Sequence, residues 1–147
     1  MKTEILFPEV ANLCGDLMNV TYLRQCCPEM EVVETGLKDR PAFLDGGVDL
    51  VYVGSATERG LQLMVKALAP YRAELERYVD GGGLMLATGN ALDALGEYVV
   101  IDGKRTFDGL GILKTHAEYH MMKRHNSFLL GSYQDMEIVG FKSLFGH

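Results

Sequence analysis

Short apolar runs alternate with amphipathic stretches over the first two-thirds of the chain. Four apolar runs predict β-strands: Glu4–Phe7, Met30–Val33, Val48–Val53 and Leu84–Ala87. The spacing between them predicts helices over Val20–Cys26, from a Thr57 N-cap to Leu68, after Pro70, and over Ala91–Glu97. Strands that alternate with helices of this length indicate a parallel sheet covered on both faces. Leu84–Ala87 carries no charge, so we expect this strand to be buried on both faces.

After residue 96 the pattern predicts strands without intervening helices. Glu97–Ile101 and Lys104–Phe107 flank Asp102-Gly103, a sequence typical of a hairpin turn. Tyr119–Leu130 and Met136–Phe141 are predicted as antiparallel strands, with Met121-Met122 and Phe128-Leu129-Leu130 in the core. We therefore expect an α/β fold of the flavodoxin-like, three-layer type, with a mostly parallel central sheet and a β-rich carboxy-terminal third. No repeat or linker divides the chain, so residues 1–147 are expected to form a single domain.

Composition and charge argue against several classes of partner and location. The net charge is −6 and no basic stripe is visible, which argues against nucleic acid as a partner. No apolar run approaches the roughly 20 residues that cross a bilayer, and the first residues lack a signal-peptide pattern. The cysteines are odd in number: Cys14, Cys26 and Cys27. They are expected to be reduced and half-buried in a cytoplasmic protein.

Three turns are predicted to open onto the same edge of the sheet, because the carboxyl ends of parallel strands share an edge. They are Asn12–Asp16, Gly54–Glu58 and Thr88–Asn90, and Asp16 or Asn19 is the expected N-cap of the helix that follows the first turn. The third turn joins a buried strand directly to a helix. Such a strand–turn–helix, called the elbow below, lifts one side chain above the sheet and aims backbone N–H groups at it. The lifted residue here is Gly89 or its neighbour Thr88.

Four blocks in order resemble the class I glutamine amidotransferases, in the branch of cobyric acid synthase and the glutaminase subunit of lipid II isoglutaminyl synthase. Asn12–Asn19 is similar to the family's Asn-Leu-Tyr-Gly-Asp-x-Gly-Asn segment, and Asp49–Ser55 to its strand ending in a Gly-rich turn. Gly89–Gly96 aligns with the family's nucleophile elbow, Cys-Gly-Gly-Tyr-Gln-Leu-Leu-Gly. Gly109–Leu113 followed by Val139–Phe141 matches the β-rich part. The resemblance implies this family's fold over nearly the whole chain.

The resemblance also implies that the family's catalytic residues are missing. The family's catalytic cysteine falls on Gly89 and its elbow glutamine on Asp93, and the family's histidine and acid lie beyond residue 147. Glutamine hydrolysis requires a thiolate, a base and an oxyanion hole. The family's oxyanion-hole region corresponds to Gly54, Ser55 and the N–H of Asn90. The resemblance therefore implies a substrate-binding set of Gly54, Ser55, Gly89, Asn90 and Asp93 without a nucleophile and without a cofactor.

Two other groups of side chains have alternative interpretations. Thr88 is either a substitute nucleophile or a strand-end threonine bonded to backbone, and the sequence favours the second because no base is adjacent. The spacing of His116, His120 and His125 is compatible with metal ligands, but no cysteine or paired carboxylate completes a ligand set. No metal site is therefore predicted.

Three functions remain open at this stage. The first is an amidotransferase-like domain without glutaminase activity, acting as a binding or partner subunit beside a synthetase or a Mur-ligase-like chain, or by self-association. The second is an active amidotransferase or amidohydrolase, in cobalamin or cell-wall precursor amidation, that uses a non-cysteine nucleophile or residues from a partner. The third is a binder of small molecules, an amide or a phosphate, at the strand-end turns.

Overall fold

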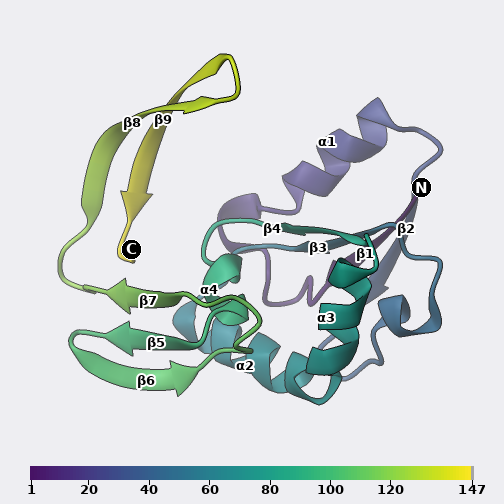
Figure 1. Cartoon of the computed structure of the whole chain (residues 1–147), viewed down its shortest axis with the longest axis horizontal. Coiled ribbons are helices and arrows are strands. Elements are labelled where there is room, and N and C mark those ends of the chain that lie inside the picture. The colour runs from purple at the N-terminus through teal and green to yellow at the C-terminus, as the bar shows by residue number, and fades with distance from the viewer. Residues whose placement is uncertain (147) are drawn as a thin grey trace.

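A four-stranded parallel sheet forms the centre of the molecule. The computed structural model describes residues 1–146 (Figure 1). The sheet contains β1 (Lys2–Leu6), β2 (Glu31–Thr35), β3 (Leu50–Val53) and β4 (Leu84–Ala87) in the order β2-β1-β3-β4. All three pairings are parallel, so the mixed α/β fold with a parallel sheet is as the sequence predicts.

The connections between these strands are helical. They contain α1 (Met18–Cys26), α2 (Glu58–Leu68) and α3 (Arg72–Asp80), with single 3-10 turns η1 (Leu13–Gly15), η2 (Ala42–Asp45) and η3 (Ala69–Tyr71). A fourth helix, α4 (Ala91–Leu95), follows β4. The predicted cap of α2 is confirmed, because the Thr57 side chain accepts a hydrogen bond from the Gly60 N–H at 3.1 Å. The predicted caps of α1 are wrong: Leu17 occupies that position, and neither Asp16 nor Asn19 caps the helix.

Alternate residues of the central strands pack on opposite sides of the sheet. Ile5 of β1 and Tyr52 of β3 pack with Val20 of α1 on one side. Val51 of β3 faces the larger cluster on the other side, together with Leu61 of α2. Side chains two residues apart on a strand share a face, so this pattern follows directly from the apolar runs of β1 and β3.

The remaining strands form two smaller sheets. In the first, β5 (Tyr98–Ile101) pairs antiparallel with β6 (Lys104–Asp108) and parallel with β7 (His116–Tyr119). The turn at Asp102-Gly103 joins β5 and β6 as predicted. The second is the hairpin of β8 (His125–Tyr133) and β9 (Met136–Leu144). The prediction of one strand over Tyr119–Leu130 is wrong, because the chain bends between β7 and β8.

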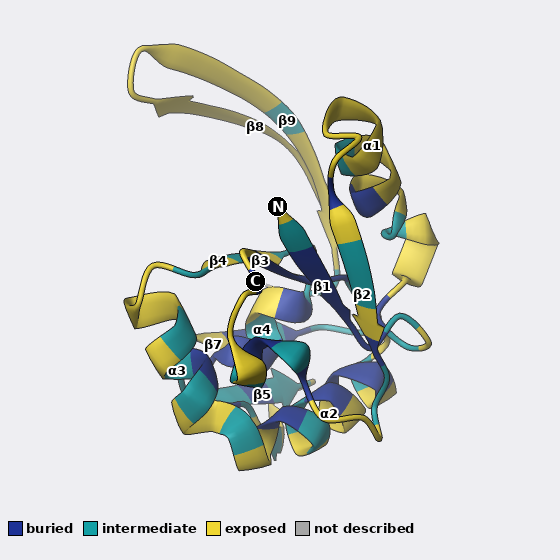
Figure 2. Ribbon diagram, turned by 90° about the vertical axis from the view of Figure 1, so that its right-hand side faces the viewer, coloured by how far each residue is buried: buried dark blue, intermediate teal, exposed yellow. Residues whose placement is uncertain are grey.

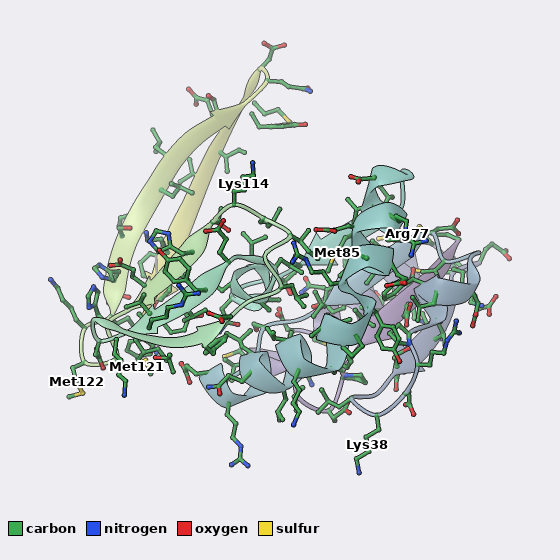
Figure 3. All side chains as sticks on the ribbon, turned by 60° about the horizontal axis from the view of Figure 1, so that its bottom comes forward. Lys38, Arg77, Met85, Lys114, Met121 and Met122 are labelled. Atoms are coloured by element: carbon green, nitrogen blue, oxygen red, sulfur yellow. The ribbon has the colours of Figure 1, made fainter. Side chains whose placement is uncertain are left out.

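Several apolar residues expected in the core are exposed. β4 is the edge of the sheet, and Leu84 and Leu86 are exposed on it, which corrects the expectation of a strand buried on both faces. Met122, at the bend after β7, is 97% exposed (Figure 3). The run Phe128-Leu129-Leu130 is also exposed, and Figure 2 shows the β8–β9 hairpin projecting from the body. Apolar composition alone does not reveal whether another element covers a strand.

Two polar side chains of β1 are buried with opposite outcomes. The Glu4 carboxylate accepts hydrogen bonds from the Thr35 hydroxyl at 2.5 Å and from the N–H groups of Ala42 and Phe43 at 2.6 and 2.7 Å. It therefore anchors η2 to the sheet. The buried hydroxyl of Thr3 has no hydrogen-bond partner among residues 1–146. A buried polar group without a partner destabilises the folded state.

The substitution Thr3→Val should raise the free energy of unfolding by about 1 kcal/mol, because it replaces an unsatisfied hydroxyl by a methyl group of similar size. Thr35→Val is the matched control: it removes a donor to the buried Glu4 carboxylate and should lower the free energy of unfolding by about 2 kcal/mol. Urea unfolding followed by circular dichroism measures both. Equal destabilisation by the two substitutions would contradict this assignment.

Candidate functional site

The three predicted turns meet at the carboxyl edge of the central sheet. The Leu13 N–H donates to the Ser55 carbonyl at 2.9 Å, which joins the turn after β1 to the turn after β3. The Thr88 N–H donates to the Val53 carbonyl at 3.0 Å, which extends the β3–β4 pairing into the elbow. Residues separated by more than 70 positions along the chain are thereby brought into one cluster.

The Asp16 carboxylate is the centre of this cluster. Its Oδ2 accepts hydrogen bonds from the Ser55 N–H at 2.6 Å and from the Thr88 hydroxyl at 2.7 Å. Its Oδ1 accepts from the Asn19 side-chain amide at 3.1 Å. Burial alone would raise the pKa of Asp16, but the hydrogen bonds from Ser55, Thr88 and Asn19 outweigh burial and hold the pKa below its ordinary value.

The hydroxyl of Thr88 is held from two sides. The buried Tyr52 hydroxyl lies 3.1 Å from Thr88 Oγ1 and donates to the Asp16 carbonyl at 2.7 Å. Sequence reasoning expected no base beside Thr88, and the structure instead brings the Asp16 carboxylate to it. A carboxylate with a lowered pKa is a weak base at neutral pH. The contact therefore restrains the hydroxyl more than it activates it.

Gly89 lies at the tip of the elbow with φ +54°, a left-handed conformation in which a side chain is strained. A Cβ placed on Gly89 would lie 2.8 Å from the Cβ of Ser55, closer than real Cβ contacts allow. Gly54 is under a similar constraint, because a Cβ there would lie 2.2 Å from the Ala11 carbonyl oxygen. The tip thus has no side chain and no space for one while Ser55 keeps its position.

The side chain of Asn90 is used within the fold. Its Oδ1 accepts from the Ala56 N–H at 3.0 Å, and its Nδ2 donates to the Ala56 carbonyl at 2.8 Å. This pair of bonds fixes the elbow against the turn that precedes α2. Ser55 is engaged as well, since its hydroxyl donates to the Leu13 carbonyl at 3.2 Å. Ser55 and Asn90 belong to the binding set that the resemblance implies. In this structure their side chains instead hold neighbouring turns together.

Asp93 lies one turn further along α4 and connects the elbow to the second sheet. The Tyr119 hydroxyl of β7 donates to Asp93 Oδ2 at 2.5 Å. Burial raises the pKa of Asp93, and the bond from Tyr119 opposes that shift. Burial and the Asp93 carboxylate together raise the pKa of Tyr119. Asp93 is thus paired with a tyrosine that sequence reasoning did not single out.

The other candidate residues lie outside this cluster. All three cysteines are exposed, which corrects the expectation of half-buried thiols. His116 stacks on Tyr98 with ring centroids 4.9 Å apart, and the rings of His120 and His125 are 6.3 Å apart. Within residues 1–146 no group of three or more His, Cys, Asp or Glu side chains is arranged to hold a metal ion. None of the helices in that range is long and apolar enough to span a membrane.

An apolar groove of about 310 Å³ lies beside α4, on the open edge of β4. The side chains that line it are all apolar: Leu75, Val79, Met85, Leu86, Ala87, Leu92, Leu95, Ile112 and Leu113. An amide or phosphate ligand needs hydrogen-bond donors and acceptors, which these side chains do not supply. The polar groups at the carboxyl edge of the sheet are instead those of the Asp16 cluster.

Sequence reasoning found the three turns and the elbow but not the residue that joins them. Asp16 was expected only as a helix cap, and Tyr52 only as part of a strand. The available signal was position: a carboxylate at the end of the first turn lies on the same edge as the other two turns. Hydrogen-bond partners that are 39 and 72 residues away are not encoded in local spacing.

The two aspartates should respond to pH in opposite directions. The Asp16 pKa is lowered on folding, so its contribution to stability is present above the unfolded value of 3.8 and is lost as pH falls through the folded pKa. The Asp93 pKa is raised, so wild type gains stability from Asp93 as pH falls toward 3.8.

We expect wild type to lose stability relative to Asp16→Asn on acidification from pH 6 to about pH 3, whereas it gains stability relative to Asp93→Asn. Urea unfolding at a series of pH values measures both differences. The same slope for both variants would contradict the two assignments.

Comparison with known proteins assigns the chain to no family. No protein-family model matches the chain, and no curated protein sequence matches it.

Proposed function

We propose that this chain is a class I glutamine amidotransferase-like domain without glutaminase activity, which serves as a binding or partner subunit. The observation that carries the proposal is the elbow tip. Gly89 has no side chain, and a Cβ at position 89 would lie only 2.8 Å from the Cβ of Ser55. A covalent mechanism of amide hydrolysis needs a nucleophile at this tip.

The rest of the cluster supports the same conclusion. The Ser55 N–H, part of the implied oxyanion hole, donates to Asp16 at 2.6 Å. A donor that already binds a carboxylate of its own protein does not stabilise a developing oxyanion. The edge therefore keeps the geometry of an elbow while its reactive groups bind each other.

The proposal includes a finer description of the fold and its setting. The strand order, with α1 on one side of the sheet and α2 on the other, supports a flavodoxin-like three-layer arrangement. The family resemblance implies a partner chain, an amide-forming synthetase or a Mur-ligase-like subunit, and a small amide as ligand. The odd number of unpaired cysteines supports a cytoplasmic location.

One contact favours a second candidate, an active amidohydrolase that uses Thr88. The Thr88 hydroxyl lies 2.7 Å from the Asp16 carboxylate, the distance of a nucleophile from its base. The lowered pKa of Asp16 weakens that base, and the Tyr52 hydroxyl also lies against the nucleophile. We therefore rank this candidate second.

Ammonia release from glutamine separates the two candidates. The purified chain should release no ammonia above a protein-free blank, because the tip carries no nucleophile. Thr88→Ala should give the same result, with Thr106→Ala as a control for an exposed threonine outside the elbow. Turnover by wild type that Thr88→Ala abolishes and Thr106→Ala preserves would overturn the proposed function and support the second candidate.

A further inference from the structure

The β8–β9 hairpin is separated from the body of the molecule except at its base. Its two strands pair with each other from His125 opposite Leu144 to Tyr133 opposite Met136. At the base, Tyr119 forms a bridge with Gly146, and the His120 N–H donates to the Phe145 carbonyl at 2.9 Å. Both Figure 1 and Figure 2 show the hairpin projecting from the body, and Figure 2 shows it exposed along most of its length. A two-stranded hairpin without a second layer is only marginally stable in water.

One face of this hairpin, here called the apolar face, has two successive rows of large apolar residues. Phe128 is opposite Phe141, and Leu130 is opposite Val139. These four residues are 85%, 63%, 80% and 72% exposed, respectively. The two phenylalanine rings meet edge to face with centroids 5.8 Å apart. The two rings therefore contact each other across the strands, and all four side chains remain exposed.

Polar rows bound the apolar face at both ends. Toward the base, the Ser143 hydroxyl donates to Asn126 Oδ1 at 2.8 Å. Beyond that row the Arg124 guanidinium lies 4.5 Å from the centre of the Phe145 ring. Toward the tip, the next row contains Glu137. An apolar centre with a polar rim is the anatomy of a protein interface.

We propose that the apolar face is the contact between two copies of this chain, packed face to face with the tip of each hairpin over the base of the other. A two-fold axis between the two apolar rows stacks the Phe128 row of one copy on the Leu130 row of the other. The row containing Glu137 then lies over the row of Asn126 and Ser143, next to Arg124. The result is a two-layer sandwich of the kind that stabilises isolated hairpins.

The area of the apolar face fits an interface between two copies. Aromatic side chains bury roughly 150–250 Å² each and the two aliphatic ones bury less, so the exposed fractions of these four residues amount to roughly 500 Å² per copy. The polar rows on either side bring the face close to the roughly 800 Å² per partner of a stable interface. A second copy of the face, which has the same size and shape, is therefore a sufficient cover.

Charge selects the tip-to-base orientation. Glu137 and Arg124 are at opposite ends of the face, so this orientation brings unlike charges together twice. The reverse orientation would bring each charge against its own copy. The opposite face of the hairpin is less suitable, because Gly131 and Gly140 interrupt its apolar rows and Lys142 lies on it. This inference concerns a surface outside the elbow and is independent of the proposed function.

Analytical ultracentrifugation of the full chain over a range of concentrations tests the proposal. Wild type should sediment as a concentration-dependent dimer, and Leu130→Lys as a monomer. Leu129→Lys is the matched control: it makes the same change at the neighbouring position on the opposite face, and it should remain a dimer. Circular dichroism of each variant checks that the fold is retained. A monomeric wild type, a dimeric Leu130→Lys, or monomers for both variants would overturn the proposal.

A charge exchange tests the orientation without touching the apolar rows. Glu137→Lys and Arg124→Glu should each weaken association roughly fivefold to tenfold, because each creates like-charge contacts at both ends of the interface. The double variant should recover wild-type association. Weakening by the single variants without recovery in the double variant would overturn the tip-to-base arrangement.

Discussion

The Asp16 carboxylate is the interaction on which the carboxyl edge of the sheet depends. Parallel strands end at the same edge, but the loops that follow them are tethered only at their strand ends. Asp16 joins the first turn to the second through the Ser55 N–H and to the third through the Thr88 hydroxyl, at 2.6 and 2.7 Å. Hydrogen bonds to an ionised acceptor are stronger than those between neutral groups. One side chain therefore contacts all three segments, and the bonds of Leu13 with Ser55 and of Asn90 with Ala56 join the same turns in pairs.

The same contacts determine what the edge can do chemically. Each bond to Asp16 occupies a group that a catalytic elbow would need free, a backbone donor from Ser55 and a hydroxyl from Thr88. Asn90 is similarly occupied by both polar groups of Ala56, at 3.0 and 2.8 Å. A site whose donors and acceptors are paired internally is rigid, and its polar groups are not available to a reacting amide. The polar side chains at this edge therefore hold the three turns to one another.

Local patterns predicted most of the central fold. The β4 strand, the Thr57 cap and the hairpin turn at Asp102-Gly103 each follow from a few neighbouring residues. The pattern did not predict which apolar strand residues are covered by another element. Leu84 in β4 and Phe128 in β8 look like core residues because they are apolar, yet one lies on a sheet edge and the other on a projecting hairpin. The pairing of Asp93 with Tyr119 was equally unpredictable, because it depends on how the second sheet packs against α4.

The proposed function depends on the claim that Ser55 leaves no space for a side chain at the elbow tip. A double-mutant cycle between Gly89 and Ser55 tests this claim most directly. Gly89→Cys should lower the free energy of unfolding by about 1–3 kcal/mol, because it places a side chain at positive φ and against Ser55. In the background of Ser55→Gly, which vacates that space, the same substitution should be less destabilising by at least about 0.5 kcal/mol. If Gly89→Cys is equally destabilising in both backgrounds, or not destabilising at all, then Ser55 does not close the tip.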